Sequence, residues 1–172
     1  SANGFHQPVS FGDQRVAPAQ HRRIAGHVGV AARRRLDHVL GHELVHAFQF
    51  AVIRASETGL QAAQGFPLWF IEGMSEYLSL GSRAPLTSMW MRDAVLHDDI
   101  PSFAQMTRDP RYFPYRFGHS VLAYIGGRFG DAAVGRLFRS VVRYQWTGGH
   151  RRELGLTPTQ LSRNWQAIVR DR

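Results

Sequence analysis

The segment LDHVLGHELVHAFQFAV spans residues 36–52 and indicates the fold class. Its apolar residues recur at steps of three and four, the period of an amphipathic helix: Leu36, Val39, Leu40, Leu44, Val45, Phe48 and Val52. The pattern predicts a helix over about residues 34–55. On that helix His42 and His46 are four positions apart, so their imidazole rings project from one face, one turn from each other.

Outward from this stretch, helical patterns alternate with short breaks. We expect the segment ETGLQAAQGF (57–66) to be a connecting loop. Pro67 suits a first helical position and Gly81 a C-cap, while Asp131 and Thr157 suit N-caps. The predicted helices are 67–80, 87–99, a short turn at 102–106, 115–130, 131–146 and 157–172.

The first 34 residues have a different character. They carry Gly, Pro, Gln and Arg without a sustained period of 2 or 3.6, which is typical of a loop or arm. The segment RIAGHVGVA (23–31) predicts at most one weak strand, because its glycines disfavour a strand. The sequence therefore predicts a basic N-terminal arm over 1–34 and one mainly α-helical domain over 35–172.

Length and composition fit one globular domain. The chain has 172 residues, enough to bury a core, and 44% of them are hydrophobic. It has no cysteine, so any metal must be bound by His, Asp or Glu. No apolar run approaches the roughly 20 residues that cross a bilayer. The chain begins with Ser and has no signal-peptide pattern at its start, so we expect it to be a piece of a longer protein.

The net charge of +8 raises the hypothesis of an arginine-rich nucleic-acid binder. All 21 basic residues are arginine, and they are spread along the chain. The one dense cluster has no aromatic residue among its members, so base stacking has no support there: Arg22, Arg23, Arg33, Arg34 and Arg35. We expect no nucleic-acid partner, and strong salt-dependent binding to DNA or RNA is the observation that would reverse this view.

The histidine pair points to a metal site. Two imidazoles at i and i+4 can reach one ion at a Zn–N distance of about 2.0–2.1 Å. Glu43 follows His42 directly, beside such an ion rather than on it, where a carboxylate can act as general base toward water. The competing interpretation is a helix with two solvent-facing histidines, His42 and His46.

A catalytic zinc ion needs a third protein ligand. The metzincin pattern is excluded because Gln49 and Val52 stand where that pattern needs Gly and His. Glu57 is close in sequence, but a loop would fix its carboxylate poorly. Glu72 is the better candidate, because its neighbours at 68–71 are apolar and a buried carboxylate there needs a cation or a partner. Its alternative role is to pair with a buried arginine.

Glu76 lies one turn after Glu72 on the same predicted helix face. From there it can accept a hydrogen bond from the outer ring nitrogen of a metal-binding histidine, His42 being the expected one. Without a nearby cation the two carboxylates would repel each other. The alternative is that Glu76 is an ordinary solvent-facing carboxylate.

The segment HELVHAFQ (42–49), followed by PLWFIEGMSEYLSLG (67–81), resembles the gluzincin metallopeptidases, most closely the bacterial peptidase-MA-like domains. The resemblance covers roughly residues 36–172. It implies an α+β, zincin-like fold, one zinc ion held by His42, His46 and Glu72, and hydrolysis of a peptide or protein substrate with Glu43 as base. It also implies a parent protein that is often exported and often carries a further domain.

The chain departs from this family at its N-terminus. Gluzincins place a small sheet before the helix that carries the two histidines, and its edge strand binds the substrate backbone. Residues 1–34 offer at best one strand, so we expect a short or incomplete N-terminal sheet. The alternative function is therefore an inactive zinc-binding or peptide-binding module derived from a metallopeptidase.

Hydrolysis also needs a donor for the oxyanion. Tyr115 and His119 are four apart at the start of a predicted helix and can share a face toward the site, and the resemblance supports a Tyr or His in this region. Each also has a purely structural alternative. Tyr112 is a weaker third candidate. The remaining histidines are assigned no role: His6, His21, His27, His38, His97 and His150.

Overall fold

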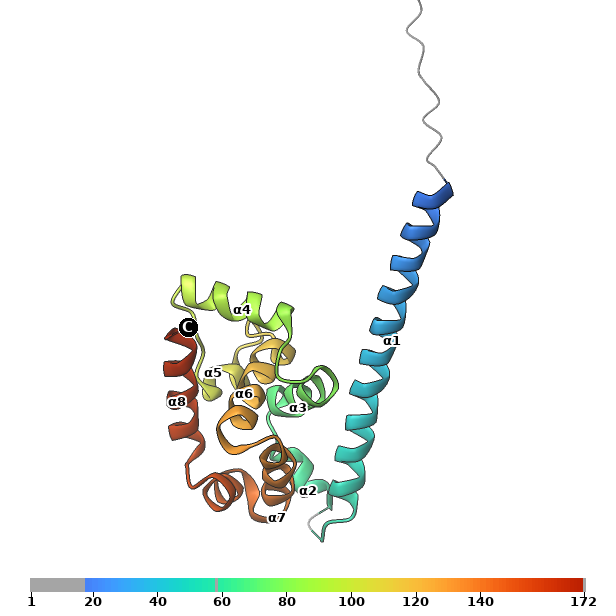
Figure 1. Cartoon of the computed structure of the whole chain (residues 1–172). Helices are drawn as coiled ribbons and strands as arrows, with labels where there is room; N and C mark the ends of the chain where they lie inside the picture. Colours follow the sequence, from blue (N-terminus) through green and yellow to red (C-terminus); the bar gives the residue numbers. More distant parts are fainter. Residues whose placement is uncertain (1–17, 58, 172) are drawn as a thin grey trace, which may run out of the picture. The chain divides into compact units, whose positions relative to one another are not determined.

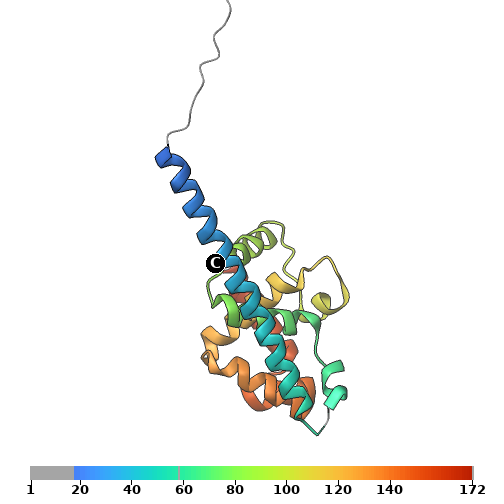
Figure 2. The ribbon, with the colours of Figure 1, turned by 90° about the vertical axis from the view of Figure 1, so that its right-hand side faces the viewer.

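The computed structural model describes residues 18–57 and 59–171, and these residues form helices and no strand (Figures 1 and 2). The mainly helical class predicted from the sequence is therefore confirmed. The helices are α1 Pro18–Arg54, α2 Gly59–Gln64, α3 Leu68–Leu80, α4 Pro85–Leu96, α5 Phe103–Arg108, α6 Pro114–Phe129, α7 Ala132–Leu154 and α8 Pro158–Arg170.

The chain divides into two compact units, residues 1–36 and 37–172. In the first unit the described residues are helical from Pro18 onward. The weak strand expected over 23–31 is therefore wrong, as is a loop reaching residue 34. A lone strand would leave its backbone N–H and C=O groups without a ladder, whereas a helix pairs them within the segment. The arm's first 17 residues lie outside the described part.

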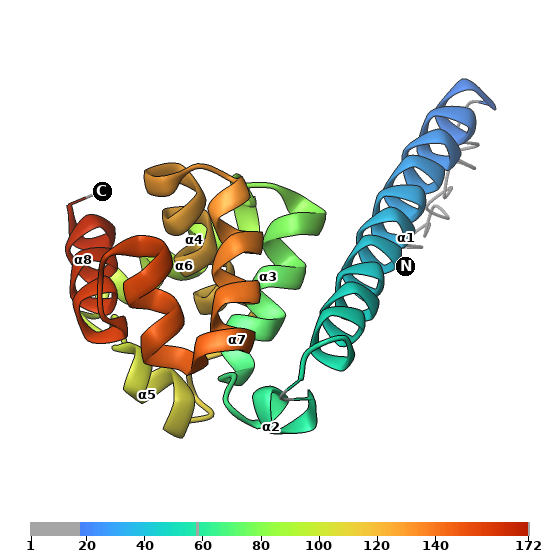
Figure 3. The same cartoon turned by 90° about the horizontal axis from the view of Figure 1, so that it is seen from below.

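Helices α3 and α6 make the most extensive contact of the second unit. Their backbones touch at two glycines, Gly73 and Gly118. The contact leaves no room for a side chain, since a Cβ at Gly118 would overlap the Trp69 carbonyl oxygen. Figures 1 and 3 both show α6 between α3 and α8. This close approach fixes the register between the carboxylates of α3 and the side chains that begin α6.

The core of the second unit is built from the inner faces of α3, α6, α7 and α8. Its indole and phenyl rings meet edge-on or tilted, the arrangement that aromatic pairs prefer. Core side chains no more than 1% exposed are Trp69, Phe70, Met74, Val121, Leu122, Ile125, Ala133, Val134, Leu137, Phe138, Leu161 and Trp165. The core thus backs the helix that carries Glu72 and Glu76.

Several predicted helix ends are confirmed. Gly81 ends α3 with φ 77°, and its N–H donates to the Tyr77 carbonyl oxygen. Thr157 opens α8 with a capping box shared with Gln160. Asp131 precedes α7 but makes no side-chain cap; its carboxylate instead accepts a 2.5 Å hydrogen bond from the Tyr77 hydroxyl.

Other predicted boundaries differ. Residues 59–64 form α2 within the expected loop. Pro67 is the N-cap of α3 rather than its first residue. Helix α7 continues beyond residue 146 to Leu154, but its backbone breaks at Gln145, where φ is 62°. The predicted end of this helix therefore coincides with a kink, after which a second helical segment follows.

Within the described residues, no helix combines the length and the apolar character that crossing a membrane requires.

Candidate metal centre

The second unit brings together three of the predicted ligand atoms. His42 Nε2 lies 3.1 Å from His46 Nε2 and 3.2 Å from Glu72 Oε2. His46 Nε2 lies 3.4 Å from the same Glu72 oxygen. A tetrahedral zinc ion with ligand distances of about 2.0–2.1 Å holds its ligand atoms roughly 3.3 Å apart. The three atoms therefore have the spacing of one facial ligand set for such an ion.

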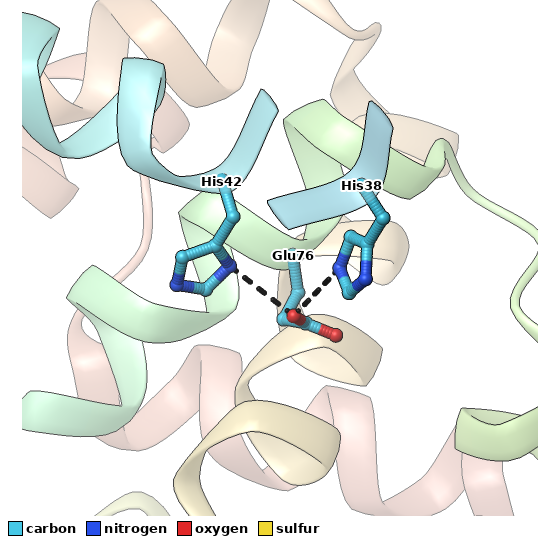
Figure 4. Close-up of side chains that lie close together, drawn as sticks. All are labelled: His38, His42 and Glu76. Atoms are coloured by element: carbon cyan, nitrogen blue, oxygen red, sulfur yellow. Dashed lines mark hydrogen bonds and ion pairs between the residues drawn. The ribbon is translucent and has the colours of Figure 1, made fainter. Parts of the chain in front are cut away.

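The outer nitrogen of His42 faces Glu76. His42 Nδ1 lies 3.2 Å from Glu76 Oε1, and Glu76 is only 2% exposed. The same carboxylate oxygen accepts a 3.0 Å hydrogen bond from His38 Nε2, and Figure 4 shows both imidazoles aimed at it. Arg116 Nη1 donates to the other oxygen at 2.6 Å. Glu76 is thus a buried acceptor fixed by three cationic or donor groups.

The outer nitrogen of His46 also has an acceptor. His46 Nδ1 donates to Gln49 Oε1 at 2.8 Å. The Gln49 amide nitrogen donates to the Ile71 carbonyl oxygen at 3.1 Å, which fixes which end of the amide faces the histidine. Ser75 Oγ lies 3.3 Å from the same ring nitrogen. Gln49 is 2% exposed, so this contact is inside the protein.

These outer contacts determine the tautomers of both rings. A proton on each Nδ1 satisfies Glu76 and Gln49, and it leaves both Nε2 atoms as lone pairs. Two lone pairs and a carboxylate oxygen then face one another across 3.1–3.4 Å. That arrangement is repulsive unless a metal ion or a shared proton lies among the three atoms. The donor set, two imidazoles and one carboxylate, is the one that zinc accepts in catalytic sites.

A second group of three potential ligands shares His42. Ligand atoms of His38, His42 and Glu76 lie within 4.8 Å of one another. However, Arg116 already donates to Glu76 with side-chain exposures of 13% and 3%, and a metal ion beside this guanidinium would meet like charge. The group fits the role of an outer layer that orients His42.

Tyr115 lies against the same centre. Its ring stacks on the His42 ring with centroids 5.8 Å apart and an interplanar angle of 24°. Burial, the charge of Glu72 and a hydrogen bond to Glu72 raise the pKa of the Tyr115 hydroxyl, with smaller effects from Glu76 and Glu43. The phenol therefore stays protonated at neutral pH and is a hydrogen-bond donor. Glu43 itself is exposed on α1, between the two histidines.

The other two oxyanion candidates lie in different surroundings. His119 is 1% exposed, and its Nε2 donates to the Gly81 carbonyl oxygen at 2.8 Å. Burial lowers the pKa of His119, so the ring is neutral. The Tyr112 hydroxyl donates to Asp99 at 2.7 Å. Among the three candidates, the structure brings Tyr115 to the histidine pair.

Three residues at this centre were not singled out from the sequence. His38 is four positions before His42 and Gln49 is three after His46, so helical spacing alone could have found both. Arg116 could not be found this way, because its contact with Glu76 depends on how α3 and α6 pack. An arginine partner was the alternative role considered for Glu72. In the structure Arg116 instead pairs with Glu76, one turn later on α3.

Two of the remaining histidines, His97 and His150, have partners outside the centre. His97 is exposed at the C-cap of α4, beside Asp93. His150 is fully buried, and its Nδ1 donates to the Trp146 carbonyl oxygen at 2.7 Å. The side chains of His6, His21 and His27 are outside the described part.

In comparisons with protein-family models, with characterised proteins and with solved structures, nothing matches this chain.

Proposed function

We propose that the chain is a zinc-dependent metallopeptidase that holds one zinc ion with His42, His46 and Glu72. One observation carries the proposal: Nε2 of each histidine and a Glu72 oxygen converge at 3.1–3.4 Å while both outer nitrogens face acceptors. Histidine pairs that merely face solvent have no need of such outer partners. The gluzincin resemblance of the motifs at 42–49 and 67–81 supplies the reaction, peptide hydrolysis.

When bound, zinc would supply a Lewis acid for the scissile carbonyl and would lower the pKa of water toward neutrality. Glu43 projects beside the ligand pair and takes the proton from the attacking water. It then returns that proton to the leaving amine, as a general base that becomes a general acid. Its exposure gives it access to water and to a substrate.

Tyr115 is the oxyanion donor in this proposal. Its raised pKa keeps the phenol proton in place, and its stacking on His42 holds the ring beside the ligands. In the resting protein the hydroxyl bonds to Glu72; with substrate present it would turn toward the oxygen that gains charge. Removing one such donor typically costs about 100- to 1,000-fold in rate.

The test combines zinc content with a matched pair of variants. We expect close to one zinc per chain after dialysis against metal-free buffer, and cleavage of a fluorogenic peptide library. Glu43→Gln should keep the zinc and lose hydrolysis by a factor of about 100 or more. Zinc bound with no cleavage in the parent chain would favour the inactive binding module instead.

A second pair of variants tests the ligand set. His46→Ala and Glu72→Ala should each abolish stoichiometric zinc, because two protein ligands hold the ion too weakly. His97→Ala is the control, since this histidine is exposed and apart from the centre. Retention of one zinc in both ligand variants would refute the assignment.

A further inference from the structure

The outer face of α1 is an apolar stripe that no described helix covers. Residues 37–54 of this helix belong to the second unit, and the side that carries His42 and Gln49 contacts α3. Figures 1 and 3 show α3 on one side of this part of α1 and no described helix on the other. On that outer side six positions recur at steps of three and four, and we call them the α1 seam: Asp37, Leu40, Leu44, Ala47, Ala51 and Arg54.

All six residues of the α1 seam are exposed. Leu40 is 53% exposed and Leu44 is 71% exposed. A single exposed leucine is ordinary, but consecutive apolar side chains along one stripe leave a continuous apolar surface in water. Steps of three and four are also the spacing with which one helix packs along another in a coiled coil. The α1 seam therefore has the pattern of a surface that packs against a helix.

The order of residues in the α1 seam identifies the partner. Its two charged residues stand at opposite ends, and its leucines fill one half while its alanines fill the other. When a second copy of the seam runs antiparallel to the first around a twofold axis, three kinds of pair form, each of them twice: Asp37 with Arg54, Leu40 with Ala51, and Leu44 with Ala47. Each end then joins opposite charges, and each inner layer joins a large side chain to a small one. The seam is thus complementary to itself.

A parallel pair of helices would lack this match. Each Asp37 would face its own copy, as would each Arg54, so both ends of the seam would join like charges. The inner layers would pair leucine with leucine in one half and alanine with alanine in the other, so the two helix axes could not keep one separation. The sequence of the seam therefore favours the antiparallel arrangement.

We propose that two copies of this chain associate through the α1 seam as an antiparallel helix pair. None of the three proposed zinc ligands belongs to the seam, so the association needs neither zinc nor peptidase activity and can be measured on metal-free protein. Because the seam is short, the association is weak, and we expect a dissociation constant of roughly 10–100 μM.

Analytical ultracentrifugation of the metal-free protein, from about 2 to about 500 μM, measures this association. The average mass should rise from that of one chain at the lowest concentration toward that of two chains at the highest. Leu44→Glu should abolish the rise, because it places a carboxylate against Ala47 of the second copy. Leu96→Glu is the matched control, since this leucine is 70% exposed on α4 and lies outside the seam, so this variant should associate like the parent chain.

Charge reversal tests the antiparallel register. Asp37→Arg alone and Arg54→Asp alone should each weaken the association about tenfold, because each turns two attractive pairs into two repulsive ones. The double variant Asp37→Arg/Arg54→Asp should recover the association, since the same pairs form again with their signs exchanged. In a parallel pair the double variant would gain nothing, because each charge would still face its like.

Circular dichroism of each variant confirms that its helices are intact. A parent chain that stays monomeric at every concentration would overturn the proposal, as would a dimer that persists in the folded Leu44→Glu variant. A double charge reversal that associates as weakly as the single reversals would also overturn it.

Discussion

Replacing Gln49 with methionine tests the outer layer of the metal centre. The two side chains have similar length and volume, so packing is largely kept, but the thioether cannot accept the His46 Nδ1 proton well. The lost bond is 2.8 Å long and inside the protein. The Ile71 carbonyl oxygen, which also loses a donor, keeps Ser75 Oγ at 3.2 Å. The change thus acts mainly on the orientation of His46.

Losing an outer partner of a metal-binding histidine typically weakens metal affinity about 10- to 100-fold, which corresponds to roughly 1.4–2.8 kcal/mol. We expect a loss of this size for Gln49→Met in a zinc titration against a competing chelator, with the thermal unfolding of the metal-free protein little changed. Gln49→Glu should recover part of the affinity that Gln49→Met loses, because one carboxylate oxygen accepts the same proton while the other faces the Ile71 carbonyl oxygen in place of the amide nitrogen.

Gln64→Met, at an exposed position of α2, is the matched control and should change neither quantity. Zinc binding by Gln49→Met as tight as that of the parent chain would contradict a role of Gln49 in orienting His46. Equal losses of affinity in Gln49→Met and Gln49→Glu would also contradict it, since that result would indicate a packing defect.

Two further predictions concern stability. Gly118→Ala should lower the free energy of unfolding by about 2 kcal/mol, because its methyl group overlaps the Trp69 carbonyl oxygen. Gly127→Ala, on the same helix with open space around it, should instead raise the free energy of unfolding by up to about 1 kcal/mol. Urea unfolding measures both variants, and equal effects would contradict the packing of α3 on α6. Burial lowers the pKa of His150 to about 4, below the unfolded value of about 6.5. In acid the unfolded chain therefore binds a proton that the folded chain does not. This difference leaves the free energy of unfolding unchanged above pH 6.5 and lowers it, by at most about 3 kcal/mol, as the pH falls toward 4. Compared with the parent chain, His150→Leu should unfold with a shallower pH dependence across that window, and an identical slope would contradict the burial.

The sequence was most informative where helical periodicity and chemistry coincide. The spacing of His42, His46, Glu72 and Glu76 places each pair on one helix face, so only the meeting of two helices remained to be learned. The glutamates also stood among apolar neighbours, which marked their helix as packed. These local signals need no knowledge of tertiary structure.

What the sequence could not reveal depends on packing between helices. The register of α3 on α6 rests on the contact of Gly73 with Gly118, and glycine carries no periodic signal. Arg116 reaches Glu76 only through that register. The strand expected within 23–31 was wrong because α1 continues through this segment although its residues show no helical period. The kink at Gln145 could not be predicted either, because the residue at that position does not mark a break in a helix.

The decisive measurement is a zinc-edge anomalous difference map from zinc-loaded crystals. We expect one peak per chain, about 2.0–2.1 Å from Nε2 of His42, Nε2 of His46 and a carboxylate oxygen of Glu72. A peak on His38 and Glu76, or no peak at either group in fully loaded crystals, would contradict it.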